Sequence, residues 1–161
     1  MPKGSANRHK FNERQLKMLY LITKILHLLC VCVVLGYLVY DVCVFSFFKK
    51  TRSEAEFTAL KRELLKPSVA LFAPAFLLML LSGAVLASFY MGGGLGFWQN
   101  AVQKMLWLKI AVIALLFVFT PISFYYILVL KKPDPFRRYY HHLALFICLA
   151  ALVIAKLLFV V

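Results

Sequence analysis

The sequence predicts an all-α membrane protein: a bundle of four transmembrane helices, with a short amphipathic surface helix between the first and the second. Of its 161 residues, 63% are hydrophobic, and the mean hydropathy is +0.84. A soluble domain of this size needs a polar shell that such a composition does not supply. The apolar residues also form four blocks, each longer than the ~20 residues that cross ~30 Å of hydrocarbon. Four crossings use most of the chain and leave room for a single domain.

The first half of the chain divides into a tail, a long helix and a surface helix. Residues 1–18 are polar and basic, and we expect a loose tail. The first transmembrane helix covers about 19–48. Ser53 and Glu56 have the spacing of a capping box, which predicts the start of the surface helix. The apolar face of that helix comprises Phe57, Leu60, Leu64 and Leu65.

The second half continues the pattern. The second transmembrane helix covers about 68–90, with Pro67 in its first turn, and the glycine-rich segment 91–100 predicts a flexible turn. The third helix covers about 104–130, with a kink expected at Pro121, and the fourth covers about 139–161. Aromatic residues fall where interfacial belts belong: Tyr20, Tyr90, Trp98 and Trp107 at one end, and Tyr125, Tyr126, Tyr139 and Tyr140 at the other.

The net charge of +13 indicates anionic lipid headgroups as partners rather than nucleic acid, because most Lys and Arg flank the apolar blocks. Their distribution favours cytoplasmic loops after the first and third helices. No cleavable signal is predicted, because the first apolar block is too long and no small-residue cleavage site follows it. The four cysteines lie within apolar blocks, which is typical of packing residues: Cys30, Cys32, Cys43 and Cys148.

Ionisable residues at membrane depth are costly, so they are the candidates for function. His27 lies about 12 Å into the first helix by the helical rise. Its imidazole could ligate a metal or a haem iron, or it could be a neutral histidine hydrogen-bonded to a neighbouring helix. Both interpretations remain open from the sequence, although four-helix bundles often hold cofactors between facing helices.

Three lysines lie near the same end of the bundle as His27: Lys24, Lys109 and Lys156. Pointing inward, they would form a cationic ring for the carboxylates of a tetrapyrrole or a quinol-like ligand. Pointing outward, they would reach the headgroups. Lys109 follows Trp107 closely and begins an apolar run, and for this lysine we expect the inward orientation.

A second group of polar residues lies at the other end of the bundle. His141 and His142 begin the fourth helix, too far from His27 to share one haem with it. Asp41 is near this end and could pair with Arg138 or His142, which would be a structural pairing. The sequence contains no serine–histidine–aspartate set, no paired carboxylates and no framed phosphate loop, which excludes ordinary hydrolysis and phosphoryl transfer.

The order of motifs resembles the HemJ-type protoporphyrinogen oxidases and the related CopD-like membrane proteins. The motifs are LHLLCVCVVLG, APAFLLMLLSG, WLKIAV and FRRYY, and they contain His27, Gly36, Pro74, Gly83, Lys109 and Arg138. The resemblance implies a four-helix protein of the bacterial cytoplasmic membrane that binds haem b. It implies electron transfer from a porphyrinogen to a respiratory-chain acceptor, with His27 associated with haem and Lys109 as an essential cation.

Three functions follow as alternatives. The first is a haem-containing membrane oxidoreductase in which His27 is the axial ligand, Lys109 is catalytic, and Lys24 and Lys109 bind propionates. The second is a CopD-like copper-handling protein in which His27, Cys30 and Met79 meet Cu(I), whose preferred ligands are soft. The third is a non-catalytic membrane subunit, in which packing satisfies every polar residue. Each is compatible with a homo-oligomer.

Overall fold

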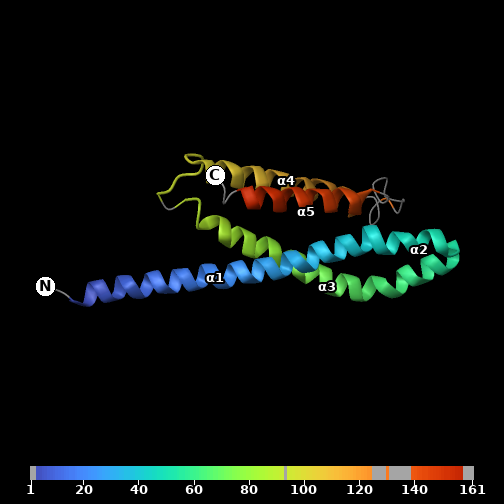
Figure 1. Cartoon of the computed structure of the whole chain (residues 1–161), viewed down its shortest axis with the longest axis horizontal. Coiled ribbons are helices and arrows are strands. Elements are labelled where there is room, and N and C mark those ends of the chain that lie inside the picture. The colour runs from blue at the N-terminus through green and yellow to red at the C-terminus, as the bar shows by residue number, and fades with distance from the viewer. Residues whose placement is uncertain (1–2, 93, 125–129, 131–138, 158–161) are drawn as a thin grey trace.

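The computed structural model describes residues 3–92, 94–124, 130 and 139–157. These residues form helices without any strand (Figure 1). In chain order the elements are α1 (Lys3–Val39), the π-helix η1 (Tyr40–Phe45), α2 (Ser46–Thr51), α3 (Glu54–Ser88), α4 (Ala101–Phe124) and α5 (Tyr140–Leu157).

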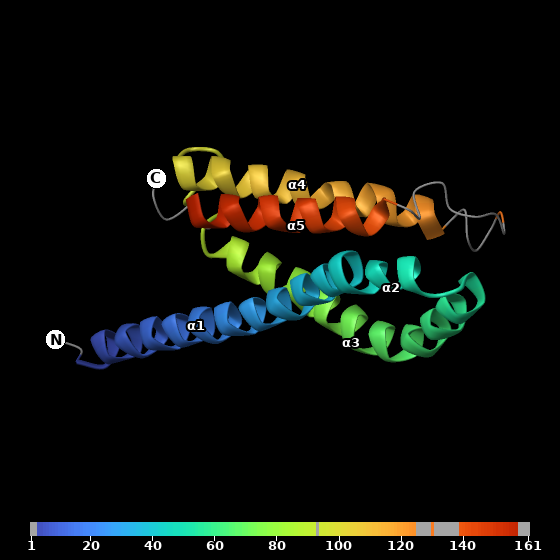
Figure 2. The same cartoon turned by 45° about the vertical axis from the view of Figure 1, so that its right-hand side comes forward.

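The helices associate as two pairs. In both views α1 and α3 cross, and α4 and α5 run side by side in opposite directions (Figures 1 and 2). The pairs meet where α5 contacts α1 and η1. This arrangement leaves one broad face of most helices uncovered, and large apolar side chains such as Leu21, Ile25 and Leu29 of α1 are exposed there. Such faces match a hydrocarbon solvent better than water.

Three helical segments are long and apolar enough to cross a membrane: Asn12–Thr51, Lys66–Ser88 and Tyr140–Leu157. They support the predicted multi-pass membrane protein. The remaining predicted span, the third, corresponds to α4, which is described only as far as Phe124. The remainder of the predicted third helix, the basic loop 131–138 and the end of the fourth helix at 158–161 lie outside the described residues.

The first helix is longer than predicted. We expected residues 1–18 to form a loose tail, but α1 begins at Lys3 and projects beyond the other helices (Figure 2). Most residues of this segment are good helix formers, and the adjoining apolar helix supplies the nucleus that a short helix lacks by itself. The prediction of a loose tail is therefore wrong for the backbone from Lys3 onward.

The surface helix exists, but it is not separate. The capping box is confirmed, since Ser53 and Glu56 exchange both of its hydrogen bonds at the start of α3. From there α3 continues without a break through Pro67 and Pro74 to Ser88. Proline at position 67 removes only one helical hydrogen bond, to the carbonyl of Glu63, and that residue is exposed. The prediction of an independent short helix is wrong.

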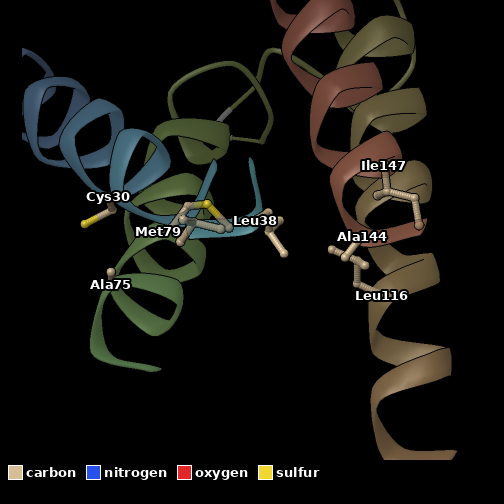
Figure 3. Close-up of a cluster of buried hydrophobic side chains, with 8 residues drawn as sticks. Cys30, Leu38, Ala75, Met79, Leu116, Ala144 and Ile147 are labelled. Carbon is tan, nitrogen blue, oxygen red and sulfur yellow. The ribbon is translucent and has the colours of Figure 1, made fainter. Parts of the chain in front are cut away.

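A single apolar core joins the two helix pairs. Its buried members, most of them labelled in Figure 3, are Cys30, Val34 and Leu38 of α1, Ala75 and Met79 of α3, Leu116 of α4, and Ala144 and Ile147 of α5. The positions on α1 and α3 recur every three or four residues, as expected for one face of a helix. The core therefore lies midway along the bundle, with polar residues at both ends.

Candidate functional site

His27 is an ionisable residue of α1 whose side chain makes hydrogen bonds to α3. Its Nδ1 atom lies 2.9 Å from the carbonyl oxygen of Met79 and 3.0 Å from Oγ of Ser82. Because a carbonyl can only accept, Nδ1 carries the proton and donates to Met79. Ser82 directs its own hydroxyl to the carbonyl of Leu78, 2.6 Å away. This arrangement leaves Nε2 of His27 as the ring atom with a free lone pair.

Gly83 determines how closely α3 approaches this imidazole. A Cβ atom at position 83 would lie 3.1 Å from Cε1 of His27, which is tighter than an ordinary van der Waals contact. Gly36 differs, because a Cβ atom there would meet nothing within 4 Å. Of these two glycines, Gly83 is the one at which the structure shows that a larger side chain would crowd its neighbour.

The charge of Lys109 acts on His27. The Lys109 side chain is half-buried on α4. Lys24 occupies a different position, with its ammonium 5.7 Å from the ring centroid of Tyr20. Lys156, the third lysine of the predicted cationic ring, is exposed on α5. Lys109 is therefore the lysine whose charge the structure relates to His27.

A pair of tyrosines closes this end of the helix pair α1/α3. The hydroxyls of Tyr20 and Tyr90 are 2.7 Å apart, and the Tyr20 ring packs edge-on against Phe89. The hydrogen bond to Tyr20, together with burial, raises the pKa of Tyr90 to about 12. Both tyrosines were predicted as interfacial residues, but nothing in the sequence predicted that they form a pair.

The glycine-rich segment 91–100 is fixed by Gln103, a residue that sequence reasoning missed. Gln103 is fully buried. Its amide nitrogen donates to the carbonyls of Tyr90, Leu95 and Gly96, each 3.0 Å away. Its Oε1 accepts from the backbone N–H of Gln99 at 2.7 Å. The segment is therefore a hydrogen-bonded loop rather than the flexible turn that we predicted.

Positive φ angles explain the glycines of this loop. Gly92, Gly94 and Gly96 have φ values of 83°, 91° and 76°. Residues with a Cβ rarely adopt this conformation, so the loop depends on glycine for its path. Trp107 contributes a further hydrogen bond to the loop, because its Nε1 donates to the carbonyl of Phe97 at 2.8 Å. The position of Gln103, shortly after a glycine-rich run, is the sequence signal from which this loop could have been predicted.

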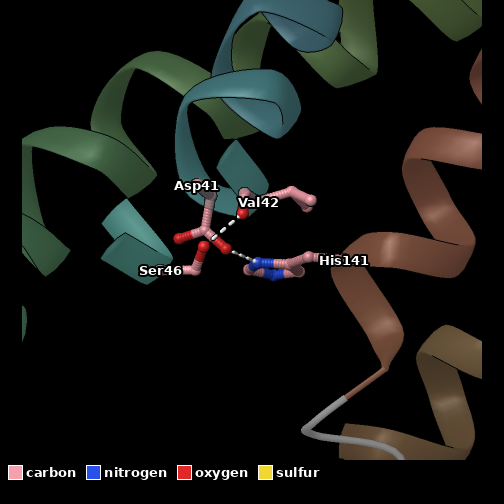
Figure 4. Close-up of polar contacts among 4 residues, drawn as sticks. All are labelled: Asp41, Val42, Ser46 and His141. Atoms are coloured by element: carbon pink, nitrogen blue, oxygen red, sulfur yellow. Dashed lines mark hydrogen bonds and ion pairs between the residues drawn. The ribbon is translucent and has the colours of Figure 1, made fainter. Parts of the chain in front are cut away.

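At the opposite end, Asp41 of η1 is hydrogen-bonded and ion-paired to Nδ1 of His141 (Figure 4). We predicted Arg138 or His142 as its partner. His142 is exposed, because the next residue along a helix points about 100° away, and His141 is the one that faces α1. Arg138 lies outside the described residues. His141 therefore takes the place that we predicted for His142, whereas the separation of this cluster from His27 is as predicted.

Two observations bear on metal binding. Within the described ranges, no group of three or more His, Cys, Asp or Glu side chains could hold a metal ion. Methionine is not one of these four residue types. Met79 lies in the same buried core as Cys30, and Cys30 is about one helical turn from His27 on α1. A metal at His27 would therefore depend on thioether and thiol ligands or on a cofactor.

Comparison with known proteins adds no relative. No protein-family model matches the chain, and neither the curated proteins nor the solved structures contain a match. The resemblance to the HemJ-type and CopD-like proteins therefore stands on the motifs alone.

Proposed function

We propose that the chain is a four-span protein of the bacterial cytoplasmic membrane that binds haem b through His27 and acts as an oxidoreductase. The observation that carries this proposal is the hydrogen bond from Nδ1 of His27 to the Met79 carbonyl. Histidines that ligate a metal commonly donate their other ring N–H to a backbone carbonyl or a carboxylate, which fixes the tautomer and the ring orientation. His27 has this arrangement.

The surrounding residues fit the same role. The glycine at position 83 lets α3 pass close to the ring, and Ser82 gives Nδ1 a second polar neighbour. Lys109 of α4, whose charge acts on the imidazole, would bind a carboxylate such as a haem propionate. Lys24, one turn before His27 on α1, would bind a second carboxylate if it left the Tyr20 ring. Bound haem b would supply one-electron redox chemistry.

The substrate and acceptor follow from the resemblance rather than from the geometry. A porphyrinogen is an anionic tetrapyrrole, and its carboxylates would meet the same lysines. The electrons would pass to an acceptor of the respiratory chain. In this proposal Lys109 is the catalytic cation, because it is the lysine whose charge acts on His27.

An absorption spectrum tests the proposal. The purified protein is expected to show a Soret band that His27→Ala abolishes while circular dichroism keeps its helical signal. His142→Gln is the matched control, because His142 is an exposed histidine at the other end of the bundle, and it should keep the band. A colourless wild-type protein from cells supplied with haem, or a band unchanged in His27→Ala, would refute haem ligation by His27.

A second candidate function is copper handling of the CopD-like kind. The observation that favours it is the burial of Cys30 and Met79 in one core beside His27, because thiol and thioether ligands prefer Cu(I). A colourless protein that binds Cu(I) stoichiometrically, and loses it in Met79→Leu, would support this function. A protein that binds neither haem nor copper would leave the third alternative, a non-catalytic membrane subunit.

A further inference from the structure

A second polar cluster lies at the end of the bundle opposite His27. Asp41 comes from η1 and His141 from the first turn of α5, and their side chains point toward each other across the gap between the two helix pairs (Figure 4). Both side chains are partly accessible, His141 at 39% and Asp41 at 25%. A carboxylate hydrogen-bonded to an imidazole in a membrane-spanning segment is costly, and such residues are candidates for function.

The backbone around Asp41 is unusual in the same place. Residues Tyr40–Phe45 form a π-helical turn within an otherwise continuous helix. Such turns are rare, and they occur frequently at functional sites. The hydroxyl of Ser46 donates to the carbonyl of Val42, which supplies a hydrogen-bond partner within the widened turn (Figure 4). The turn therefore presents Asp41 to α5 while its backbone keeps polar contacts.

Other ionisable groups face this pair from each helix that packs around it. On α1, Tyr37 lies one turn before Asp41, and its ring centroid is 6.3 Å from that of His141. On α3, the charge of Lys61 acts on Asp41, and on α5 the charge of His142 does the same. Tyr140 also contacts the His141 ring, with centroids 5.8 Å apart. Among these described side chains, Asp41 is thus the acidic one, and the others are basic or phenolic.

We propose that Asp41 and His141 form a proton-exchanging site whose protonation state controls how firmly α5 is held against η1. Imidazole is the side chain that changes its charge near neutral pH. With Asp41 ionised and His141 protonated, the contact is a charge-assisted hydrogen bond. When Asp41 takes up a proton from water, the His141 imidazolium faces the positive charges of Lys61 and His142 without a counter-charge. The hold on α5 then weakens.

This site is independent of any cofactor at His27. Fourteen residues separate His27 from Asp41, which corresponds to about 20 Å along a helix. Between them lie the buried apolar side chains of Cys30, Val34 and Leu38. The proton that Asp41 or His141 gains or loses is therefore exchanged with water at their own end. Failure of haem binding would leave this inference untouched.

The test uses the full chain in lipid nanodiscs with isotope-labelled histidine. Nuclear magnetic resonance follows the His141 ring nitrogens between about pH 2 and pH 9, a range that extends below the ordinary aspartate pKa of about 4 and above that of imidazole. Amide hydrogen exchange over residues 40–47 and 140–147, corrected for the intrinsic effect of pH, follows the contact between η1 and α5. In the wild type, we expect exchange at both segments to accelerate as Asp41 becomes protonated.

Variants separate a proton site from a merely structural contact. Asp41→Asn should accelerate exchange at both segments about tenfold at neutral pH and abolish the acid-dependent step, since a hydrogen bond to a charged group is stronger than one between neutral groups. His141→Gln should have the same effect. Lys156→Gln, an exposed change at the far end of α5, is the control and should keep the step. A wild-type His141 that does not titrate, or an Asp41→Asn variant with the wild-type pH dependence, would overturn the proposal.

Discussion

Gly83 and His27 are in such close register that a Cβ atom on the glycine would lie 3.1 Å from Cε1 of the imidazole. The glycine at this position sets the separation of α1 and α3 beside the ring, and the ring donates its hydrogen bond to the same stretch of α3. Two features of α3 therefore determine the position of His27: the absence of a side chain at Gly83 and the backbone carbonyl of Met79.

Gly83→Ala should displace the His27 ring by a few tenths of an ångström. The helical propensity of alanine, about 1 kcal/mol better than glycine, will offset much of the steric cost, so the protein should stay folded. The ring nitrogen resonances of His27 report the displacement. Gly36→Ala is the control, because its Cβ would meet nothing within 4 Å, and it should leave those resonances in place. Equal shifts in both variants would show that Gly83 does not position the ring.

Gln103→Leu should loosen the loop 91–100. The change preserves the approximate volume but leaves the Tyr90 and Leu95 carbonyls and the Gln99 N–H without this partner, whereas the Gly96 carbonyl keeps the N–H of Gly92. A polar group that stays buried without a partner costs about 1–3 kcal/mol. Hydrogen exchange over 91–103 should accelerate by at least tenfold. Lys104→Ala, at the exposed neighbouring position, should not change it. Unchanged exchange in Gln103→Leu would contradict the central role of this amide.

Tyr90→Phe should alter stability at alkaline pH. The pKa of Tyr90 is about 12, above the usual value of about 10, so folding favours the protonated phenol. The contribution of the Tyr90 phenol to the free energy of unfolding is complete below about pH 10 and is lost as the pH rises through about 12. The phenylalanine variant lacks this loss, and its melting temperature should fall less between pH 10 and 12 than that of the wild type. Parallel decline of both proteins would exclude the contribution of Tyr90.

Ser53→Ala should fray the start of α3. The Ser53 hydroxyl donates to the Glu56 carboxylate, and the Ser53 backbone N–H does so as well, and both bonds lower the pKa of Glu56. An N-cap serine contributes about 1 kcal/mol to helix stability. In the wild type this protection is present at neutral pH and is lost as the pH falls through the lowered pKa of Glu56. Exchange of the first-turn amides measures it.

The control for this prediction is Thr58→Ala, an exposed change on the same helix outside the cap. It should leave the first-turn amides protected and keep their acid-dependent loss. If Ser53→Ala exchanged no faster than the wild type at neutral pH, the capping box would not stabilise α3.

The sequence predicted the helices well because their signals are local. Apolar runs of sufficient length define α3 and α5, and the spacing of Ser53 and Glu56 defined a helix start that the structure confirms. The errors lie where neighbours override local signals. The adjoining apolar helix extends α1 back to Lys3, and α3 tolerates Pro67 near its aqueous end. A π turn inside an apolar helix has no reliable sequence signal.

The residues of the candidate site could be proposed from the sequence, but the hydrogen-bond partners of those residues could not. Ionisable residues inside apolar runs identified His27, Lys109 and Asp41. Their partners depend on tertiary register, which fixes the Met79 carbonyl for His27 and selects His141 over His142 for Asp41. Backbone acceptors carry no sequence identity, so the partner of His27 could not have been read from the chain. Whether His27 binds haem remains the prediction that the absorption spectrum addresses.

The apolar layer formed by Cys30, Val34, Leu38 and Met79 has a consequence for permeation. A hydrated ion that entered at either end would have to shed its water to pass these side chains, at a free-energy cost close to that of the bilayer itself. The described helices would thus preserve the electrical resistance of the membrane around them. Expression of the protein should not depolarise a cell, whatever chemistry its two ends perform.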